Sequence, residues 1–272
     1  MRSVLVPLTV AALAVTPMAS AEAAPSGYKV TTVSSDKTLD LTSDDGTNRT
    51  TVIKGKVSGG RVKGQKVYLY ASNTSAKDQT FRYLGSDRLS SSGRFAKRWK
   101  PKDGGSYVVN VVKRAGNGRA EGSDSTRVNV FQFVTLTKFY DGDPAKAAVV
   151  RRVDKAGSIR GQNWSKAYEI APGTSAVFTT QGYRCLRINL KIGVADSARS
   201  GGSGSFKVTQ GGRTILSGTH RKGQRHVQPS TRQQKRMRAD QPVVVTVSGS
   251  APFVLGLPKA ACTFPIRSTP KQ

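Results

Sequence analysis

The sequence predicts an all-β protein built from two β-sandwich domains. The chain has 272 residues, a length typical of one large domain or two of ordinary size. Its apolar residues form short runs rich in β-branched and aromatic side chains, such as Val67 to Tyr70 and Val243 to Val247. The 28 glycines and 12 prolines fall between those runs. Short strand-like runs separated by turn residues are typical of sheets rather than helices.

The first residues have the three parts of a secretory signal peptide. A basic residue, Arg2, precedes an apolar run from Val4 to Val15, and small residues follow at Ala21, Ala23 and Ala24. The alternative is a membrane anchor, but a run of 12 residues is shorter than the roughly 20 that span a bilayer. We therefore predict that residues 1–23 are a signal peptide and that the mature protein is extracellular, either free or associated with the cell envelope.

Residues 28–134 are predicted to form the first sandwich. In the second of the expected strands, Val67, Leu69 and Ala71 share one face while Tyr68 and Tyr70 share the other, which is the period of a half-buried strand. Turns recur every 8 to 12 residues, as is usual in sandwiches. The expected strands are Thr50 to Val57, Gln65 to Ala71, Ala96 to Trp99, Ser106 to Lys113 and Thr126 to Val134.

Several motifs of this half resemble the Ig-like domains of bacterial surface and exported proteins. They are Ile53 to Val57, Gly64 to Tyr70, Gly93 to Phe95 and Gly104 to Tyr107. The resemblance implies a sandwich of about seven strands. It also implies an alternative function, that of a structural or adhesion protein whose Ig-like domain makes protein contacts.

Residues 135–265 carry a second pattern, with residues 266–272 as a polar tail. It comprises Ser158 to Ala167, Gly182 to Asp196, Gly204 to Val208, Gly211 to Leu216 and Val243 to Val247. This order resembles the NPCBM family of carbohydrate-binding modules, which implies a jelly-roll, galactose-binding-like sandwich and a glycan ligand. Leu186, Ile188, Leu190 and Ile192 alternate with polar residues, as in a strand with one buried face.

One acidic residue in that pattern has two interpretations. By the resemblance, Asp196 would orient the following loop or hold a structural ion. As a lone carboxylate three residues after Gly193, it fits a turn cap better than an ion site. The chain departs from the family at Arg199, where a long basic segment replaces acidic and glycine residues.

The only two cysteines are Cys185 and Cys262, and in an exported chain we expect them to form a disulfide. The alternatives are two free thiols or a metal pair. No other Cys or His lies at zinc-ligand spacing from either cysteine. His220 and His226 fit surface histidines better than a metal pair. We therefore predict no metal and no cofactor.

The chain is strongly basic, with 44 lysines and arginines against 16 acidic residues and a net charge of +28. Ten of the basic residues, and no acidic one, lie between Arg199 and Arg238. Such a segment favours an anionic partner, although a solvated loop is the alternative. The predicted polyanion-binding residues are Arg221, Lys222, Arg225, Arg232, Lys235, Arg236 and Arg238. No aromatic residue interrupts them, so sequence-specific nucleic-acid binding is not expected.

A glycan site needs an aromatic ring beside polar side chains. Trp164 and Tyr168, with Arg160 and Asn163 nearby, are the predicted ligand-binding residues. The alternative for Trp164 is a core residue, as we expect for Trp99, which alternates with Phe95 in a strand.

The sequence favours binding over catalysis. It contains no Gly-x-Ser-x-Gly motif, no phosphate-binding loop and no His-Glu-x-x-His motif. Its closest acidic pairs, Asp44–Asp45 and Asp141–Asp143, lie in turn-like segments. We therefore predict a secreted, non-catalytic binding protein for an extracellular glycan or an anionic cell-surface polymer. No membrane-spanning segment is expected in the mature chain, and no pattern indicates an oligomeric state.

Overall fold

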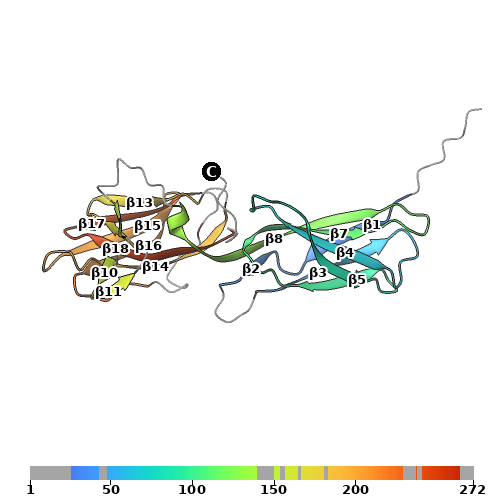
Figure 1. The fold of residues 1–272 in the computed structure, drawn as a ribbon, viewed down its shortest axis with the longest axis horizontal. Coiled ribbons are helices and arrows are strands. Elements are labelled where there is room, and N and C mark those ends of the chain that lie inside the picture. Colours follow the sequence, from blue (N-terminus) through green and yellow to red (C-terminus); the bar gives the residue numbers. More distant parts are fainter. Residues whose placement is uncertain are drawn as a thin grey trace, which may run out of the picture.

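The computed structural model describes residues 26–42, 48–139, 150–153, 157–164, 167–180, 183–228, 237 and 241–263. These residues form strands and one short 3-10 helix, η1 (Leu136–Phe139), so the predicted all-β class is confirmed. The strands make two lobes joined by one long strand (Figure 1). The predicted signal peptide and the tail 266–272 lie outside the described residues.

The first lobe contains two packed sheets. One has the order β1-β3-β6, the other runs β5-β4-β7-β8, and β2 pairs with β8 in parallel. Their inner faces meet at a core that includes Leu39, Ile53, Leu69, Val109 and Val130, all fully buried. The strands are β1 (Lys29–Ser34), β2 (Thr38–Asp40), β3 (Thr51–Ser58), β4 (Lys66–Asn73), β5 (Arg82–Arg88), β6 (Arg94–Trp99), β7 (Gly105–Lys113) and β8 (Gly122–Thr135).

Glycine allows close packing in the middle of β3. A Cβ atom on Gly55 would lie 1.8 Å from the carbonyl oxygen of Thr31 and 2.7 Å from the ring of Phe95. The missing side chain therefore lets β1 and β6 pair with β3 on both sides while the Phe95 ring fills the space beneath.

The second lobe is also a sandwich. The four-stranded sheet β13-β17-β15-β16 packs on a layer in which β18 pairs with both β12 and β14. Phe178, Ile188, Leu190 and Phe253 are fully buried between the layers. The strands are β9 (Val150–Val153), β10 (Gly157–Ile159), β11 (Gln162–Trp164), β12 (Ala167–Ile170), β13 (Thr174–Phe178), β14 (Cys185–Val194), β15 (Ser203–Gln210), β16 (Arg213–Arg221), β17 (Val243–Gly249) and β18 (Phe253–Cys262).

The predicted disulfide is present in this sandwich. Cys185 begins β14 and Cys262 ends β18, and the two residues are register partners with Cα atoms 4.0 Å apart. Both are buried, at 3% and 0% exposure. The bridge therefore fastens the paired ends of β14 and β18, two neighbouring strands that are far apart in the sequence.

A single strand connects the two lobes. Residues 122–130 of β8 pair with β7, whereas its last four residues, 132–135, pair with residues 259–262 of β18. The predicted boundary at 134/135 falls within this strand, and Val134 packs into the core of the second lobe. The main chain thus hydrogen-bonds continuously across the junction.

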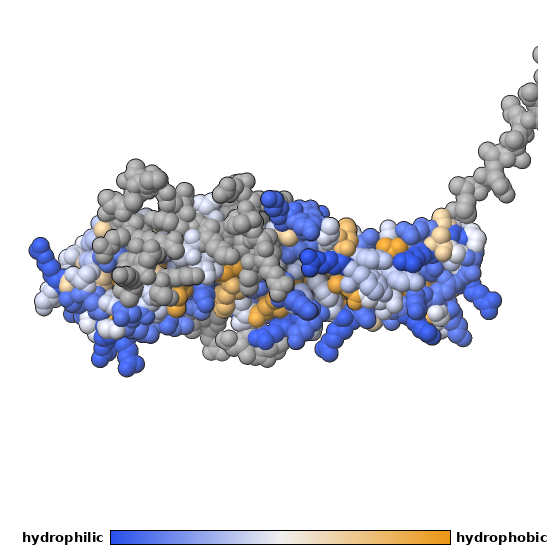
Figure 2. Space-filling view, viewed as in Figure 1, coloured by the Kyte–Doolittle hydropathy of each residue, from blue (hydrophilic) through white to orange (hydrophobic). Residues whose placement is uncertain are grey.

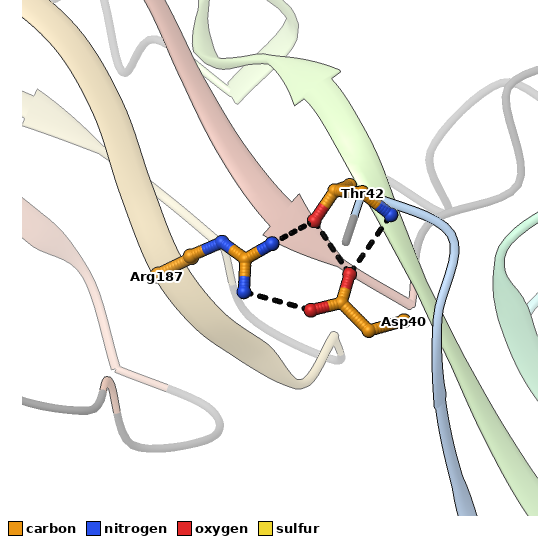
Figure 3. Close-up of polar contacts among 3 residues, drawn as sticks. All are labelled: Asp40, Thr42 and Arg187. Atoms are coloured by element: carbon orange, nitrogen blue, oxygen red, sulfur yellow. Dashed lines mark hydrogen bonds and ion pairs between the residues drawn. The ribbon is translucent and has the colours of Figure 1, made fainter. Parts of the chain in front are cut away.

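Side chains reinforce the junction. Arg187 of β14 donates a 2.7 Å hydrogen bond to the carboxylate of Asp40, which ends β2, and a second one to the hydroxyl of Thr42 (Figure 3). The Arg187 guanidinium also lies 5.7 Å from the ring centre of Phe133. Because Asp40 and Arg187 are largely buried, this pair is less screened than a surface ion pair.

The described surface on the face drawn in Figure 2 is predominantly hydrophilic. In the view of Figure 2, blue residues cover most of the described surface, and the hydrophobic patches between them are small and separate. No described helix has the length and hydrophobicity needed to cross a membrane.

Candidate functional site

The aromatic residues predicted to bind a glycan are both buried. Trp164 is 4% exposed and packs with Ile159, Ala167 and Val254. Tyr168 is 1% exposed, and its ring meets Phe178 edge-on in the main core. The sequence does not reveal this burial, because strands of three and four residues are too short for their alternation to identify the buried face.

The two polar residues of that prediction are exposed, but no exposed ring accompanies them. Arg160 lies in the turn of the β10–β11 hairpin, and Asn163 precedes the buried Trp164 in β11. A Cβ atom on Gly256 would lie 2.7 Å from the Trp164 ring, so the indole is pressed against β18. The predicted aromatic platform is therefore absent from the described part of this hairpin, and the alternative of a core tryptophan fits.

Asp196 closes the turn of the same hairpin. Its two carboxylate oxygens accept hydrogen bonds from the backbone N–H groups of Arg160, at 2.7 Å, and Gly161, at 2.8 Å. Burial acts to raise the pKa of Asp196, but these bonds, the Ser158 side chain and Lys222 hold it below its ordinary value. The turn-cap interpretation is confirmed, and within the described residues no group of three His, Cys, Asp or Glu could hold a metal ion.

The two histidines differ from the surface residues that the sequence predicted. His220 is 4% exposed, accepts a 3.2 Å hydrogen bond from the Val194 N–H at Nδ1, and donates from Nε2 to the carbonyl of Arg225 at 2.5 Å. This tautomer follows from the two partners. His226 is half-buried, with its ring edge-on to Trp164 at a centroid distance of 5.3 Å. Both histidines therefore position the segment that follows β16.

Stability is expected to fall in mild acid because of His226. Burial, together with the charges of Lys191 and Arg225 and the neighbouring His220, lowers the pKa of His226 from its ordinary 6.5. The unfolded chain then binds a proton more readily than the folded chain, so the free energy of unfolding decreases as the pH falls through 6.5. Urea unfolding at a series of pH values across this region measures the slope. His226→Gln should reduce it; an unchanged slope in the variant would contradict the assignment.

The basic segment is described only in part. Arg221, Lys222 and Arg225 are exposed at the end of β16, whereas the other four predicted residues, Arg232, Lys235, Arg236 and Arg238, lie outside the described residues. Arg221 borders a polar cleft of about 510 Å³ that also includes Ser205 and Ser248. The hydroxyls of those two serines are hydrogen-bonded to each other at 2.7 Å. Polyanion binding by this segment stays a prediction.

Three tyrosines gather on one outer sheet face of the first lobe, which we call the tyrosine face. Tyr68 and Tyr70 project outward from β4, on the side opposite to the buried Val67 and Leu69, as the alternation predicted. Tyr83 of β5 is the register partner of Tyr70 and is 56% exposed. Its ring centre lies 5.5 Å from that of Tyr70 and 6.5 Å from that of Tyr68. The three rings therefore form one contiguous group.

Polar side chains border the tyrosine face. The guanidinium of Arg114 lies 4.2 Å from the centre of the Tyr68 ring and hydrogen-bonds the side chain of Tyr70, which raises the pKa of Arg114. Across the sheet, Tyr70 is the register partner of Asn110 on β7, and Asn110 is the register partner of Ser125 on β8. A row of two tyrosine rings, one amide and one hydroxyl thus runs across the four neighbouring strands β5, β4, β7 and β8.

No known protein family is matched by this chain, and no curated protein matches it either. Among solved structures, it is similar to the CBM51-2 and INT domains of Clostridium perfringens ZmpB, at 12% identity and a TM-score of 0.40 over 62% of this chain and 39% of the other. The corresponding structure with GlcNAc gives 11% identity and 0.40, over 87% and 49%. A SusE-like protein gives 10% and 0.24, over 89% and 100%. The chain therefore spans less than half of the two ZmpB structures.

Proposed function

We propose that this protein is a secreted, non-catalytic binding protein that holds an extracellular glycan on its tyrosine face. The observation that carries the proposal is the grouping of Tyr68, Tyr70 and Tyr83 on an outer sheet face, bordered by Arg114 and Asn110. The buried Cys185–Cys262 disulfide supports export, because such bonds persist mainly outside the reducing cytosol.

The chemistry of this face suits a sugar chain. A pyranose ring has apolar C–H faces that stack on aromatic rings, while its hydroxyls need hydrogen-bond partners at the ring edge. Tyrosine offers both an aromatic face and a phenolic hydroxyl. The Arg114 guanidinium, the Asn110 amide and the Ser125 hydroxyl provide additional donors beside the rings. Because the face is a sheet surface, it suits several residues of an extended glycan rather than one enclosed sugar.

In our proposal the two lobes have different roles. The first domain, residues 28–134, carries the ligand-binding face. The second, residues 135–265, is a disulfide-closed sandwich whose strand β18 pairs with the end of β8 and so holds the first domain in a defined orientation.

Replacing Tyr83 with alanine is expected to weaken glycan binding about tenfold, since it removes the most exposed of the three rings, worth on the order of 1 kcal/mol or more. Tyr83→Phe keeps the ring and should stay within about threefold of the unchanged protein. Isothermal titration with purified neutral cell-wall polysaccharide, at about 0.15 M salt, measures both.

Val33→Ala provides the control for that experiment, because Val33 is also exposed, at 52%, but lies on the other sheet of the same lobe. Its affinity should equal that of the unchanged protein. Equal loss in the Val33 and Tyr83 variants, or no binding by the unchanged protein to any polysaccharide of a broad panel, would refute the proposed function.

A further inference from the structure

The other outer face of the first lobe is a basic surface, formed by β1, β3 and β6. Alternate residues of these strands are buried in the core, which directs the intervening side chains to solvent. None of the three strands contains Asp or Glu. The exposed positions include five cationic side chains, which together we call the basic face: Lys29, Lys54, Lys56, Arg94 and Arg98.

Like charges lie directly opposite each other on the basic face. Lys56 of β3 is the register partner of Arg94 of β6, and Lys54 lies two residues along the same strand on the same side. Cross-strand neighbours of this kind have Cβ atoms about 5 Å apart, and like charges at that distance destabilise a sheet. Among the residues that the structure describes, no carboxylate forms an ion pair with any of the five. The arrangement therefore costs stability in the absence of an anionic ligand.

The acidic residue that lines the groove is already engaged. Asp87 of β5 borders the basic face, and its carboxylate oxygens accept hydrogen bonds from the backbone N–H groups of Ala96, at 2.7 Å, and Arg88, at 2.9 Å. The Asp87 carboxylate thus accepts a hydrogen bond from a backbone N–H group on the unpaired edge of β6. An incoming anion would have to come from another molecule.

A groove of about 610 Å³ runs through the basic face. Lys54, Lys56 and Arg94 line it together with the exposed, shorter side chains of Thr31 and Ala96. Thr31 is the register partner of Lys56, and Ala96 is the register partner of Lys54, so the short side chains lie beside the cationic ones. Successive cations on one strand face are about 7 Å apart, and those on neighbouring strands about 5 Å apart. This pattern suits a chain that alternates carbon segments with closely spaced anionic groups.

We infer that the basic face binds a linear polyol or sugar polymer linked by phosphodiesters. Its phosphates would meet Lys54, Lys56 and Arg94, and its carbon segments would lie over the short side chains of Thr31 and Ala96. No aromatic ring is exposed on β1, β3 or β6, so the stacking platform that single-stranded nucleic acids use is missing from this face. This site is separate from the tyrosine face and does not depend on glycan binding there.

The test compares two double variants that change the net charge equally. K56E/R94E reverses the facing pair on the basic face, and K66E/R88E reverses another exposed, register-paired couple that lies on the sheet of the tyrosine face. The probe is purified poly(glycerol phosphate), with binding measured between about 0.05 and 0.3 M salt. We expect K56E/R94E to bind at least about tenfold more weakly and with a smaller salt dependence, and K66E/R88E to stay within about twofold of the unchanged protein.

Thermal unfolding gives an independent readout. The single variant Lys56→Glu places opposite charges across the pair, so it should melt at a higher temperature than the unchanged protein while binding the polymer more weakly. K56Q/R94Q removes the charges without adding new ones and should also bind more weakly.

Three results would overturn the inference. The first is equal loss in K56E/R94E and K66E/R88E, which would mean attraction by overall charge alone. The second is no binding of poly(glycerol phosphate) by the unchanged protein. The third is equal affinity for duplex DNA with the same dependence on Lys56 and Arg94, which would assign the face to nucleic acid. A failure of the Tyr83 variants to affect glycan binding would leave all three measurements unchanged.

Discussion

Removing the disulfide is expected to lower the free energy of unfolding by about 4 kcal/mol. The Cys185–Cys262 bond joins residues 77 apart, so it restricts a long segment of the unfolded chain. It also fastens β14 to β18, and β18 in turn pairs with β12 and with the end of β8. The measurement is urea unfolding of the double variant C185A/C262A beside the unchanged protein.

Dithiothreitol provides the control for this prediction. It should destabilise the unchanged protein by a similar amount and leave C185A/C262A unaffected. A loss below about 1 kcal/mol in the double variant would contradict the role that we assign to the bridge. Retention of the tyrosine face in the variant can be followed separately, because β4 and β5 belong to the other lobe.

Replacing Phe253 with alanine is expected to cost about 3–5 kcal/mol, since the change leaves a cavity in the centre of the second sandwich. Phe253 is fully buried at the start of β18, where it is a register partner of both Ile170 on β12 and Val194 on β14. Its ring packs near Phe206, with centroids 6.1 Å apart. A Cβ atom on Gly204 would lie 2.9 Å from this ring, so the surroundings leave no room for a shifted side chain.

The matched control for Phe253 is leucine. Phe253→Leu fills most of the same volume and should cost clearly less than the alanine change. Denaturant unfolding of the unchanged protein, Phe253→Leu and Phe253→Ala gives the order of their free energies of unfolding. If alanine and leucine are equally tolerated, the core packing that we describe around Phe253 is incorrect.

The parts of the fold that depend on local patterns could be predicted from the sequence. The alternation of Val67 and Leu69 with Tyr68 and Tyr70 identifies the two faces of β4, and Trp99 is buried as its alternation with Phe95 indicated. The pairing of Cys185 with Cys262 follows from their being the only cysteines of the chain. These inferences need no knowledge of which strands are neighbours.

The candidate site could not be predicted because it depends on neighbours distant in the sequence. Tyr83 lies in β5, a strand without regular apolar alternation, and joins Tyr70 only through the pairing of β5 with β4. The cross-strand pair Lys56 and Arg94 arises in the same way. Conversely, Trp164 occupies a polar stretch of sequence yet is buried against Gly256 of β18. A polar neighbourhood in the sequence is therefore a poor guide to exposure in short hairpins.

If the ligand contacts the tyrosine face, nuclear magnetic resonance detects the contact at the tyrosine rings themselves. The protein has eight tyrosines, and selective isotope labelling of their rings allows each to be followed during titration with a bound polysaccharide. We predict that the ring signals of Tyr68, Tyr70 and Tyr83 shift together, while that of the buried Tyr168 does not. Shifts at Tyr168 with the three surface tyrosines unchanged would show that the ligand does not bind the tyrosine face.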